Sequence, residues 1–319
     1  MRTRRSILVL VAALALLAGA CSDSDNDPSV ADDDAPNTDR ASSTIEFVPL
    51  EPGAVTFTAL ENGDVDMALL FSTQGIIAEK GWVVLEDDMT LQGSDNLIPL
   101  IRSEIADGTV ESVLNAVSAA LTTEALTELN RRVDSDREDT EVVARDFLTE
   151  NYLLEGEAAS GAGSITVGSA NFSEAEIVAQ MYRLALQHAG YDVTLRAQLG
   201  SREILIPALE AGEIDVEPEY LQSLLAYFDG ETPAVTPEEG VTLAGDLLPA
   251  GLQVLEPSPA QDQNALVVTA ETAERYGLSK VSDLLAVEDQ LKMAGPPECP
   301  ERPLCIPGYE AVYGLQFDV

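Results

Sequence analysis

The stretch ITVGSANFSEAEIVAQMYRLALQHAGYDVTLRA, residues 165–197, places one amphipathic helix between two short apolar runs. The first run, ITVGS, predicts a buried strand, and YDVTLRA (191–197) predicts the next strand. Between them Ser173 begins a helix, with Glu176 three residues later at the spacing of a capping box, and Gly190 ends it. This strand–helix–strand order indicates a parallel pair connected by a helix.

The same alternation continues along the chain. SREILIPALEAG (201–212) predicts a second helix and EIDVEP (213–218) a third strand. The resulting βαβαβ order is typical of a mainly parallel sheet covered by helices, so we predict an α/β fold.

A break at 155–164 (EGEAASGAGS) separates this segment from an earlier one, because its small residues show no apolar periodicity and indicate a flexible linker. In the earlier segment, 45–154, we predict strands near 64–71, 82–87 and 96–103. Helices are predicted near 109–121, 123–133 and 140–150.

A short internal similarity links the two segments. Residues 59–67 read ALENGDVDM and residues 208–216 read ALEAGEIDV. Each predicts a helix end, a glycine suited to a left-handed C-cap, an acid and then a strand. The helix–turn–strand succession common to α/β folds could produce a nine-residue match by chance, but two lobes of like architecture explain the match better. Two α/β lobes would enclose a cleft, where ligand pockets concentrate.

The N-terminus is typical of an export signal. Residues 1–5 contain three arginines and residues 7–20 are apolar, a run shorter than the ~20 residues of a spanning helix. We therefore predict a signal peptide at 1–20. The small residues before Cys21 resemble a bacterial lipobox, with Ala18 where Leu is usual, which predicts a lipidated Cys21. A plain secreted protein with a free Cys21 is the alternative, and both general and twin-arginine export remain open.

The net charge of the chain limits the classes of partner that it can bind. The 319 residues hold 17 Lys+Arg against 56 Asp+Glu, a formal charge of −39, with no basic run beyond the first five residues. Nucleic acid and anionic lipid surfaces are therefore poor candidate partners, because neither could supply counter-charge. Residues 21–44 contain many aspartates and almost no apolar side chains, so we predict an acidic disordered tether. A single histidine and three cysteines exclude a His-rich metal site, and no cofactor motif is found.

Several blocks of the chain, taken together, resemble the glycine betaine/choline/proline substrate-binding proteins of ABC transporters. The blocks are GSANFSEAEIVAQMYRLALQHAGYDV (168–193), ALEAGEIDVEPEYLQSLL (208–225), NALVVTAETAERYGLSKVSDL (264–284), GPPECPERPLCIPGYEAVYGLQF (295–317), LLFSTQGII (69–77), LEDDMTLQGSDNLIPLIR (85–102) and LTTEALTELNRRVD (121–134). The resemblance covers nearly all of 45–319. It implies a two-lobed periplasmic-binding-protein fold of type II with the ligand cleft between the lobes.

The blocks stand in a permuted order. In the family the part similar to 165–319 comes first and the part similar to 45–154 follows. A circular permutation explains this, with 155–164 as the new linker. The alternatives are a fusion of two decayed copies or a damaged reading frame. The permutation predicts lobe one from 165 to about 260 plus the helices of about 105–154, and lobe two from the remainder of 45–319. It also predicts that Val319 and Ile45 are close.

The resemblance implies the site residues. Family members hold a quaternary ammonium group among aromatic faces, and Tyr220 of PEYLQS matches such a tyrosine. Arg302 matches a position implied to bind the ligand carboxylate, although it could instead pair with Glu298 or Glu301. Asn171 and Phe172 follow a predicted strand, where open α/β sheets place ligands. Further and weaker candidates, each of which could instead be a cap or turn residue, are Glu219, Asn264, Thr73 and Gln74.

Three positions depart from the family pattern. Ala170 stands where Lys is frequent, Ala175 where Gln is frequent, and Asp95 where a tyrosine commonly precedes the Asn-x-x-Pro block. Aromatic residues make up only 5% of the chain, which argues against a cage of four rings. A less alkylated or more polar solute is therefore a candidate beside glycine betaine.

The cysteines that remain once Cys21 is lipidated are Cys299 and Cys305. In an exported protein they are expected to form a disulfide that closes CPERPLC, and their spacing suits neither a redox CxxC pair nor zinc.

Taken together, these features predict a monomeric solute-binding lipoprotein on the outer face of a bacterial cell membrane. It would deliver a small zwitterionic or cationic solute to an ABC permease, and it would not be an enzyme. A sensing or scaffolding protein and a non-binding fusion remain alternatives. An exported hydrolase is a further alternative, but a triad would have to use His188, and no G-x-S-x-G or HExxH motif is present.

Overall fold

The computed structural model describes residues 44–93, 95–155, 163–233 and 235–319. The expected signal peptide, Cys21 and all of the tether but Thr44 lie outside these residues, as does most of the linker. Ser164, assigned above to the linker, instead begins a strand. Within the described part, no helix is both long enough and apolar enough to cross a membrane.

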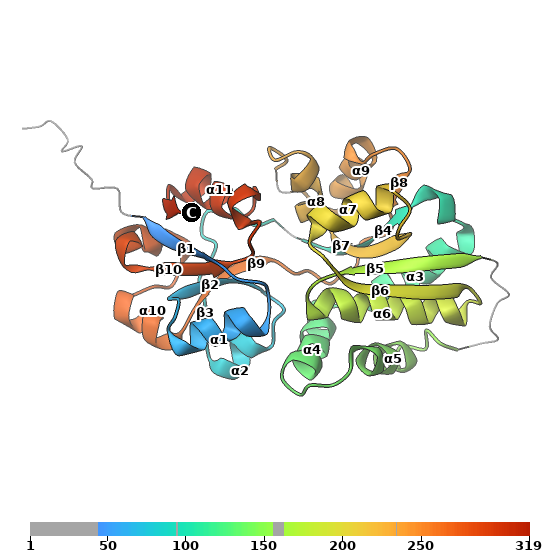
Figure 1. The fold of residues 1–319 in the computed structure, drawn as a ribbon, viewed down its shortest axis with the longest axis horizontal. Coiled ribbons are helices and arrows are strands. Elements are labelled where there is room, and N and C mark those ends of the chain that lie inside the picture. Colours follow the sequence, from blue (N-terminus) through green and yellow to red (C-terminus); the bar gives the residue numbers. More distant parts are fainter. Residues whose placement is uncertain (1–43, 94, 156–162, 234) are drawn as a thin grey trace, which may run out of the picture. The chain divides into compact units, whose positions relative to one another are not determined.

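Two sheets form the centres of two lobes (Figure 1). Lobe one has strand order β6-β5-β7-β4-β8 and lobe two has β11-β1-β10-β2-β9-β3. The strands of lobe one are β4 (Leu97–Arg102), β5 (Ser164–Ala170), β6 (Asp192–Gly200), β7 (Val216–Tyr220) and β8 (Leu252–Val254). Those of lobe two are β1 (Ile45–Pro49), β2 (Met67–Phe71), β3 (Val83–Val84), β9 (Asn264–Val268), β10 (Lys292–Gly295) and β11 (Phe317–Asp318).

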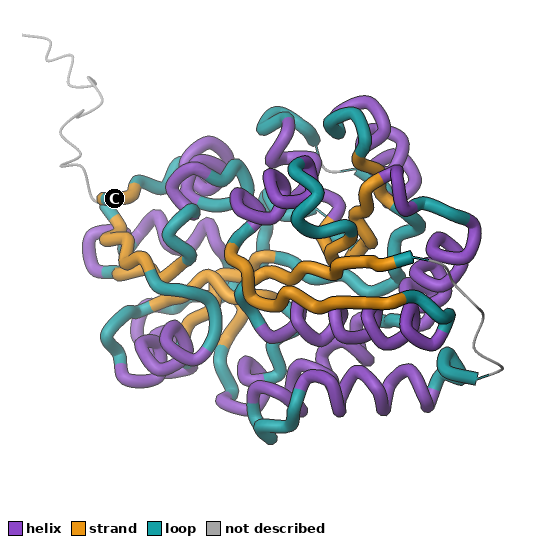
Figure 2. Tube along the Cα trace, turned by 45° about the vertical axis from the view of Figure 1, so that its right-hand side comes forward, coloured by secondary structure: helices purple, strands orange, loops and turns teal. Residues whose placement is uncertain are grey.

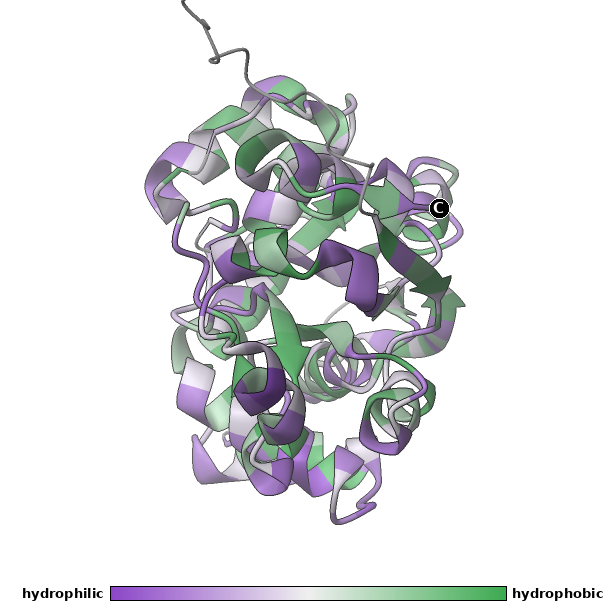
Figure 3. Cartoon of the chain, turned by 90° about the vertical axis from the view of Figure 1, so that its left-hand side faces the viewer, coloured by the Kyte–Doolittle hydropathy of each residue, from purple (hydrophilic) through white to green (hydrophobic). Residues whose placement is uncertain are grey.

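Helices cover both faces of each sheet, and the strands lie inside this helical layer (Figures 1 and 2). In lobe one these are α3 (Gly108–Ala120), α4 (Thr123–Asp134), α5 (Thr140–Glu150) and α6 (Ser173–His188) on one face, and α7 (Arg202–Glu210), α8 (Leu221–Phe228) and α9 (Pro237–Leu247) on the other. In lobe two they are α1 (Ala54–Asn62) and α2 (Ile76–Lys80) against α10 (Ala270–Tyr276) and α11 (Ile306–Gly308). Hydrophobic colour accordingly concentrates on the sheets (Figure 3).

The two lobes share one topology. In lobe one β5 pairs in parallel with β6 and β7, and β4 is antiparallel to both β7 and β8. In lobe two β10 pairs in parallel with β1 and β2, and β9 is antiparallel to both β2 and β3. The predicted α/β, two-lobed fold of type II is thus confirmed. The sheets are more mixed than expected, because β4 and β9 each arrive from the opposite lobe.

One boundary in the sequence prediction was wrong. The strand predicted near 96–103 was placed in lobe two, whereas β4 pairs with β7 of lobe one, with Ile98 opposite Glu219. The chain therefore crosses between the lobes near residue 95 rather than near 104, and it crosses back near 262. The two crossing segments run side by side, joined by a bridge between Asn96 and Gln261 and by the Asp262 amide, which donates to the Asp95 carbonyl.

The internal similarity marks equivalent turns. Gly63 after α1 and Gly212 after α7 both have left-handed φ, of 73° and 71°, as their C-terminal positions require. Asp66 and Asp215 then play one role: each bonds through its carboxylate to a backbone N–H of the neighbouring parallel strand, at Lys292 (2.9 Å) and Thr166 (2.8 Å). The repeat therefore reflects two lobes of like architecture.

Helix α6 begins at Ser173, as predicted, but without the expected capping box. Phe172, not Ser173, is the N-cap, and no side chain caps this end. The Ser173 hydroxyl instead donates to Asp134 of α4 (2.6 Å), and Glu176 accepts from Thr140 of α5. The capping-box prediction was wrong because these two side chains join α6 to neighbouring helices.

Candidate functional site

A cavity of about 340 Å³ lies between the lobes, within the roughly 300–1,000 Å³ typical of ligand pockets. Segments that follow the parallel strands of both lobes line it. They include Glu51 after β1, Asn171 and Phe172 after β5, Tyr220 at the end of β7 and Pro296 after β10. The cavity is therefore at the carboxyl ends of the strands, where open α/β sheets place ligands.

Three aromatic rings meet at this cavity. Phe172 lies between the other two, with ring centroids 5.0 Å from Phe71 and 6.2 Å from Tyr220. Phe71 ends β2 of lobe two, while Phe172 and Tyr220 belong to lobe one, so the aromatic surface spans both lobes. Phe71 was not among the site residues predicted from sequence, although it lies in the block LLFSTQGII (69–77), which resembles the family.

Six of the eight residues proposed from sequence line the cavity: Tyr220, Arg302, Asn171, Phe172, Glu219 and Asn264. Asn171 donates to Glu51 of lobe two (2.8 Å), and Asn264 donates to the Gln92 side chain and the Leu304 carbonyl. Thr73 and Gln74 do not line this cavity. Thr73 is fully buried beside it, and Gln74 lines a second cavity of about 540 Å³.

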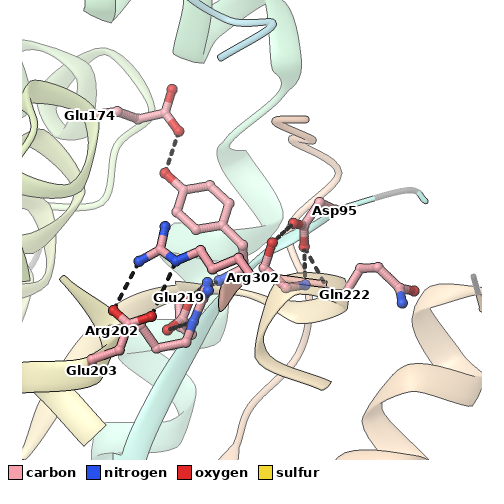
Figure 4. A network of polar contacts seen from close by, with 9 residues as sticks. Asp95, Glu174, Arg202, Glu203, Glu219, Gln222 and Arg302 are labelled. Carbon is pink, nitrogen blue, oxygen red and sulfur yellow. Dashed lines mark hydrogen bonds and ion pairs between the residues drawn. The ribbon is translucent and has the colours of Figure 1, made fainter. Parts of the chain in front are cut away.

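Arg302 forms an ion pair across the cleft. Its Nε and Nη2 donate to the two carboxylate oxygens of Glu203 in lobe one, at 3.1 and 2.9 Å (Figure 4). The partner is thus neither Glu298 nor Glu301, the two alternatives considered from sequence. Partial burial acts to raise the pKa of Glu203, but hydrogen bonds from Arg302 and Ser201 outweigh it and lower that pKa to about 2.

A second arginine pair is buried in lobe one. Arg202 Nε and Nη2 donate to both oxygens of Glu219, at 2.8 and 2.6 Å (Figure 4). Only 12% and 5% of the two side chains are exposed. Two residues earlier on β7, Glu217 is fully buried, and neither of its carboxylate oxygens has a hydrogen-bond partner among the described residues.

Asp95 connects the crossing segment to α8. Its Oδ1 accepts from the backbone N–H groups of Gln222 and Ser223, and its Oδ2 accepts from the Ser223 hydroxyl (Figure 4). Asp95 therefore caps a helix 127 residues away in sequence, whose own N-cap residue, Tyr220, provides no side-chain bond. Burial raises the pKa of Asp95 to about 6.

A buried network joins the cavity to both lobes. The Tyr220 hydroxyl donates to Glu174 Oε1, and Glu174 Oε2 accepts from Thr73 of lobe two and from Asn130 of α4. Burial raises the pKa of Glu174, while these three donors oppose the shift. Asp262 accepts from Ser72 and from the Thr73 amide, which ties the second crossing segment to lobe two. Sequence could not reveal this network, whose members are up to 190 residues apart.

Acids outnumber cations around the cavity. Its lining includes two arginines, Arg202 and Arg302, each already paired, against eight acids: Glu51, Asp95, Glu203, Glu217, Glu219, Asp262, Glu298 and Glu301. No group of three or more His, Cys, Asp or Glu within the described ranges is arranged to hold a metal ion. The arrangement suits an organic cation, held by aromatic faces and carboxylates.

Cys299 and Cys305 are joined by a disulfide, with their Cα atoms 5.3 Å apart. The bridge closes the loop that contains Arg302 and Glu301. His188 lies at the other end of α6 from the cavity, about 22 Å along the helix from Ser173. Its ring contacts the Glu155 carbonyl.

Two lobes of one topology, joined by adjacent crossing segments, thus enclose a cavity lined by polar and aromatic side chains. The chain belongs to the family of substrate-binding domains of ABC-type glycine betaine transport systems (OpuAC), whose sequence model matches residues 47–150 and 163–319.

Curated relatives agree with this family. The chain is 31% identical over 168 residues to a glycine-betaine-binding protein of Pseudomonas aeruginosa, covering 49% of this chain and 53% of that protein. It is 26% identical over 163 residues to the glycine betaine-binding protein YehZ of Escherichia coli K12, with the same coverage. It is also 31% identical over 117 residues to the carnitine transport binding protein OpuCC of Listeria monocytogenes, covering 35% and 38%. The chain thus spans about half the length of the first two.

Among solved structures, a phosphate-binding protein of Streptococcus pneumoniae TIGR4 is similar at 14% identity and a TM-score of 0.37, covering 72% of this chain and 79% of that one.

Proposed function

We propose that this chain is an extracytoplasmic solute-binding protein that delivers a quaternary-ammonium or related compatible solute, of the glycine betaine, choline and proline class, to an ABC importer. The observation that carries the proposal is the aromatic surface of Phe71, Phe172 and Tyr220 at a cavity between two lobes. Aromatic faces attract an organic cation by about 0.5–2 kcal/mol per ring. Closure of the lobes around the solute would complete the site.

Within this proposal Tyr220 and Phe172 contact the cationic group, and Asn171, Glu219 and Asn264 shape the surrounding wall. Arg302 is the candidate for a ligand carboxylate, in competition with Glu203, which occupies its two donors. Thr73 and Gln74 act at the lobe boundary, where Thr73 bonds to Glu174. The proposed role of these residues is binding rather than catalysis.

The proposal includes a signal peptide at 1–20, a lipid on Cys21 that holds a monomer near its permease, and an acidic tether at 21–44. We also propose that the chain is circularly permuted, with 45–154 equivalent to the C-terminal half of the family and 165–319 to the N-terminal half. In support, β11 pairs with β1, placing Phe317 opposite Ile45, and the family matches two segments that meet at the linker.

A thermal-shift screen of glycine betaine, choline, carnitine, proline and related amines on residues 42–319 tests the function. A ligand at 100 times its dissociation constant is expected to stabilise the protein by about 2.7 kcal/mol. A screen in which no solute raises the melting temperature would reject a solute-binding role.

A further inference from the structure

Glu217 is a buried acid that the described structure leaves without a partner. It lies on β7 two residues before Glu219, so both side chains project from the same face of the sheet. Leu100 and Ile98 of β4 stand directly opposite these two acids, and both are fully buried. Glu217 therefore occupies a position whose neighbour across the strands is apolar.

An unpaired carboxylate in such a place is costly, because an ionised group loses its hydration without gaining hydrogen bonds. Burial, assisted by the nearby charge of Glu219 and opposed by Arg202, raises the pKa of Glu217 well above its usual range. Buried polar groups are normally hydrogen-bonded, so this one calls for a specific reason. An apolar side chain would fill a purely structural position better.

The surroundings point to a missing cation. Glu217 is part of the cavity lining, together with Glu219 and Arg202. Arg202 is the positive charge that acts on Glu217, but it is already paired with Glu219 through two hydrogen bonds. Arg302, the other arginine of the lining, is likewise bonded twice to Glu203. The cavity lining therefore includes one buried carboxylate without a hydrogen-bond partner, that of Glu217, and no open guanidinium fork for a ligand carboxylate.

We propose that the cleft binds a cation that carries N–H groups and no carboxylate, and that Glu217 pairs with its head group. This rests on the proposed solute-binding role but departs from its named solutes, because glycine betaine and proline carry a carboxylate and choline carries no N–H group. A quaternary ammonium has no N–H and can satisfy a buried carboxylate only by charge. A primary or secondary ammonium, or a guanidinium, donates charge-assisted hydrogen bonds as well. The rings of Phe71, Phe172 and Tyr220 then cover the apolar part of the same ligand.

A graded ligand series tests the pairing. Choline, N,N-dimethylethanolamine, N-methylethanolamine and ethanolamine share one skeleton and carry zero, one, two and three N–H groups. Their dissociation constants are measured by calorimetry on residues 42–319, for the wild type and for Glu217→Gln, with agmatine as a guanidinium probe and glycine betaine as the zwitterion. Glu213→Gln is the matched control, because Glu213 is an exposed acid on the turn before β7.

In the wild type we expect at least one N–H-bearing cation to bind about tenfold or more tightly than glycine betaine. Glu217→Gln should lower the ratio of the ethanolamine affinity to the choline affinity by about tenfold relative to the wild type. The contribution of the methyl groups cancels when this ratio is compared between the two proteins. Glu213→Gln should leave the ratio unchanged. Melting curves establish that each variant is folded, and Gln matches Glu in size, so folding should be retained.

The outcomes separate the two proposals. If glycine betaine or choline binds most tightly and Glu217→Gln leaves the ratio unchanged, the inference about Glu217 is wrong while the solute-binding function stands. If no compound of the series, agmatine or glycine betaine binds the folded wild type, both proposals are wrong.

Discussion

Arg302 of lobe two and Glu203 of lobe one face each other across the cleft and share two hydrogen bonds, of 3.1 and 2.9 Å. Roughly a third of each side chain is exposed, so water weakens the pair. Since both residues line the cavity, their pairing competes with any ligand carboxylate.

The first prediction concerns this pair. Arg302→Ala should weaken binding of carboxylate-free cations by no more than about fivefold, because it removes a partly exposed ion pair of about 0.2–1 kcal/mol. Glu203→Gln should have a similar effect, and the double variant should be less than additive. Calorimetry with glycine betaine beside choline provides the check. A loss of about a hundredfold confined to glycine betaine would instead assign Arg302 to the ligand carboxylate.

Tyr220 contributes a ring to the cavity and a hydroxyl to the buried network, and two variants separate these roles. Tyr220→Phe should retain solute affinity within about threefold but lower the free energy of unfolding by about 1–3 kcal/mol, because Glu174 loses a donor. Tyr220→Ala should also lower the affinity by tenfold or more. Urea unfolding and calorimetry measure the two effects. Equal affinities for the Ala variant and the wild type would remove Tyr220 from the site.

The pH dependence of stability should reflect Asp95. Its folded-state pKa, about 6, is above the ordinary value of 3.8, so the native state favours the protonated form. The stability that this form provides is fully present below about pH 4 and is lost as the pH rises through about 6. Asp95→Asn should therefore become progressively more stable relative to the wild type between pH 4 and 6.5. The slope should be at most about 1.4 kcal/mol per pH unit.

Urea unfolding of Asp95→Asn and wild type at several pH values measures this difference. Burial also raises the pKa of Glu174, Glu217 and Asp262. Because both proteins contain these three acids, their contribution to the pH dependence of stability cancels in the difference. A difference between the two proteins that stays constant from pH 4 to 6.5 would contradict a raised pKa for Asp95.

The proposed permutation predicts that the segments can be exchanged. A variant that runs 163–319, a linker of about six Gly and Ser residues, and then 45–155 should fold and bind the same solute within about threefold. The linker needs to span only from Val319 to Ile45, and Ile45 pairs with Phe317 two residues before that end. Circular dichroism and calorimetry provide the comparison. A reordered chain that fails to fold, beside a control that carries the same linker inserted at 155–163, would count against the permutation.

The local sequence pattern predicted most of the fold but few of the hydrogen bonds and ion pairs within the site. The spacing of apolar residues and the placement of glycines predicted the bounds of β5, α6 and β6 to within a few residues, since these elements depend on neighbours in sequence. β4 was assigned to the wrong lobe because a crossing strand has the same apolar pattern in either sheet. The two alternative partners considered for Arg302 lay within four residues of it, whereas its partner in the structure, Glu203, is 99 residues away. Asp95 attracted notice only as a departure from a family pattern, whereas its role as a helix cap depends on the assembled fold.

The surplus of acids around the cleft has a kinetic consequence. Low-dielectric walls lined by one sign of charge focus the electric field outward, which raises the encounter rate of counter-charged molecules by roughly 10–1,000-fold. A cationic solute would accordingly be captured from dilute medium faster than a neutral one of the same size. Because mobile ions screen such steering beyond about 10 Å at 0.1 M, the advantage would shrink as external salt rises. The protein would thus scavenge fastest where its surroundings are least saline.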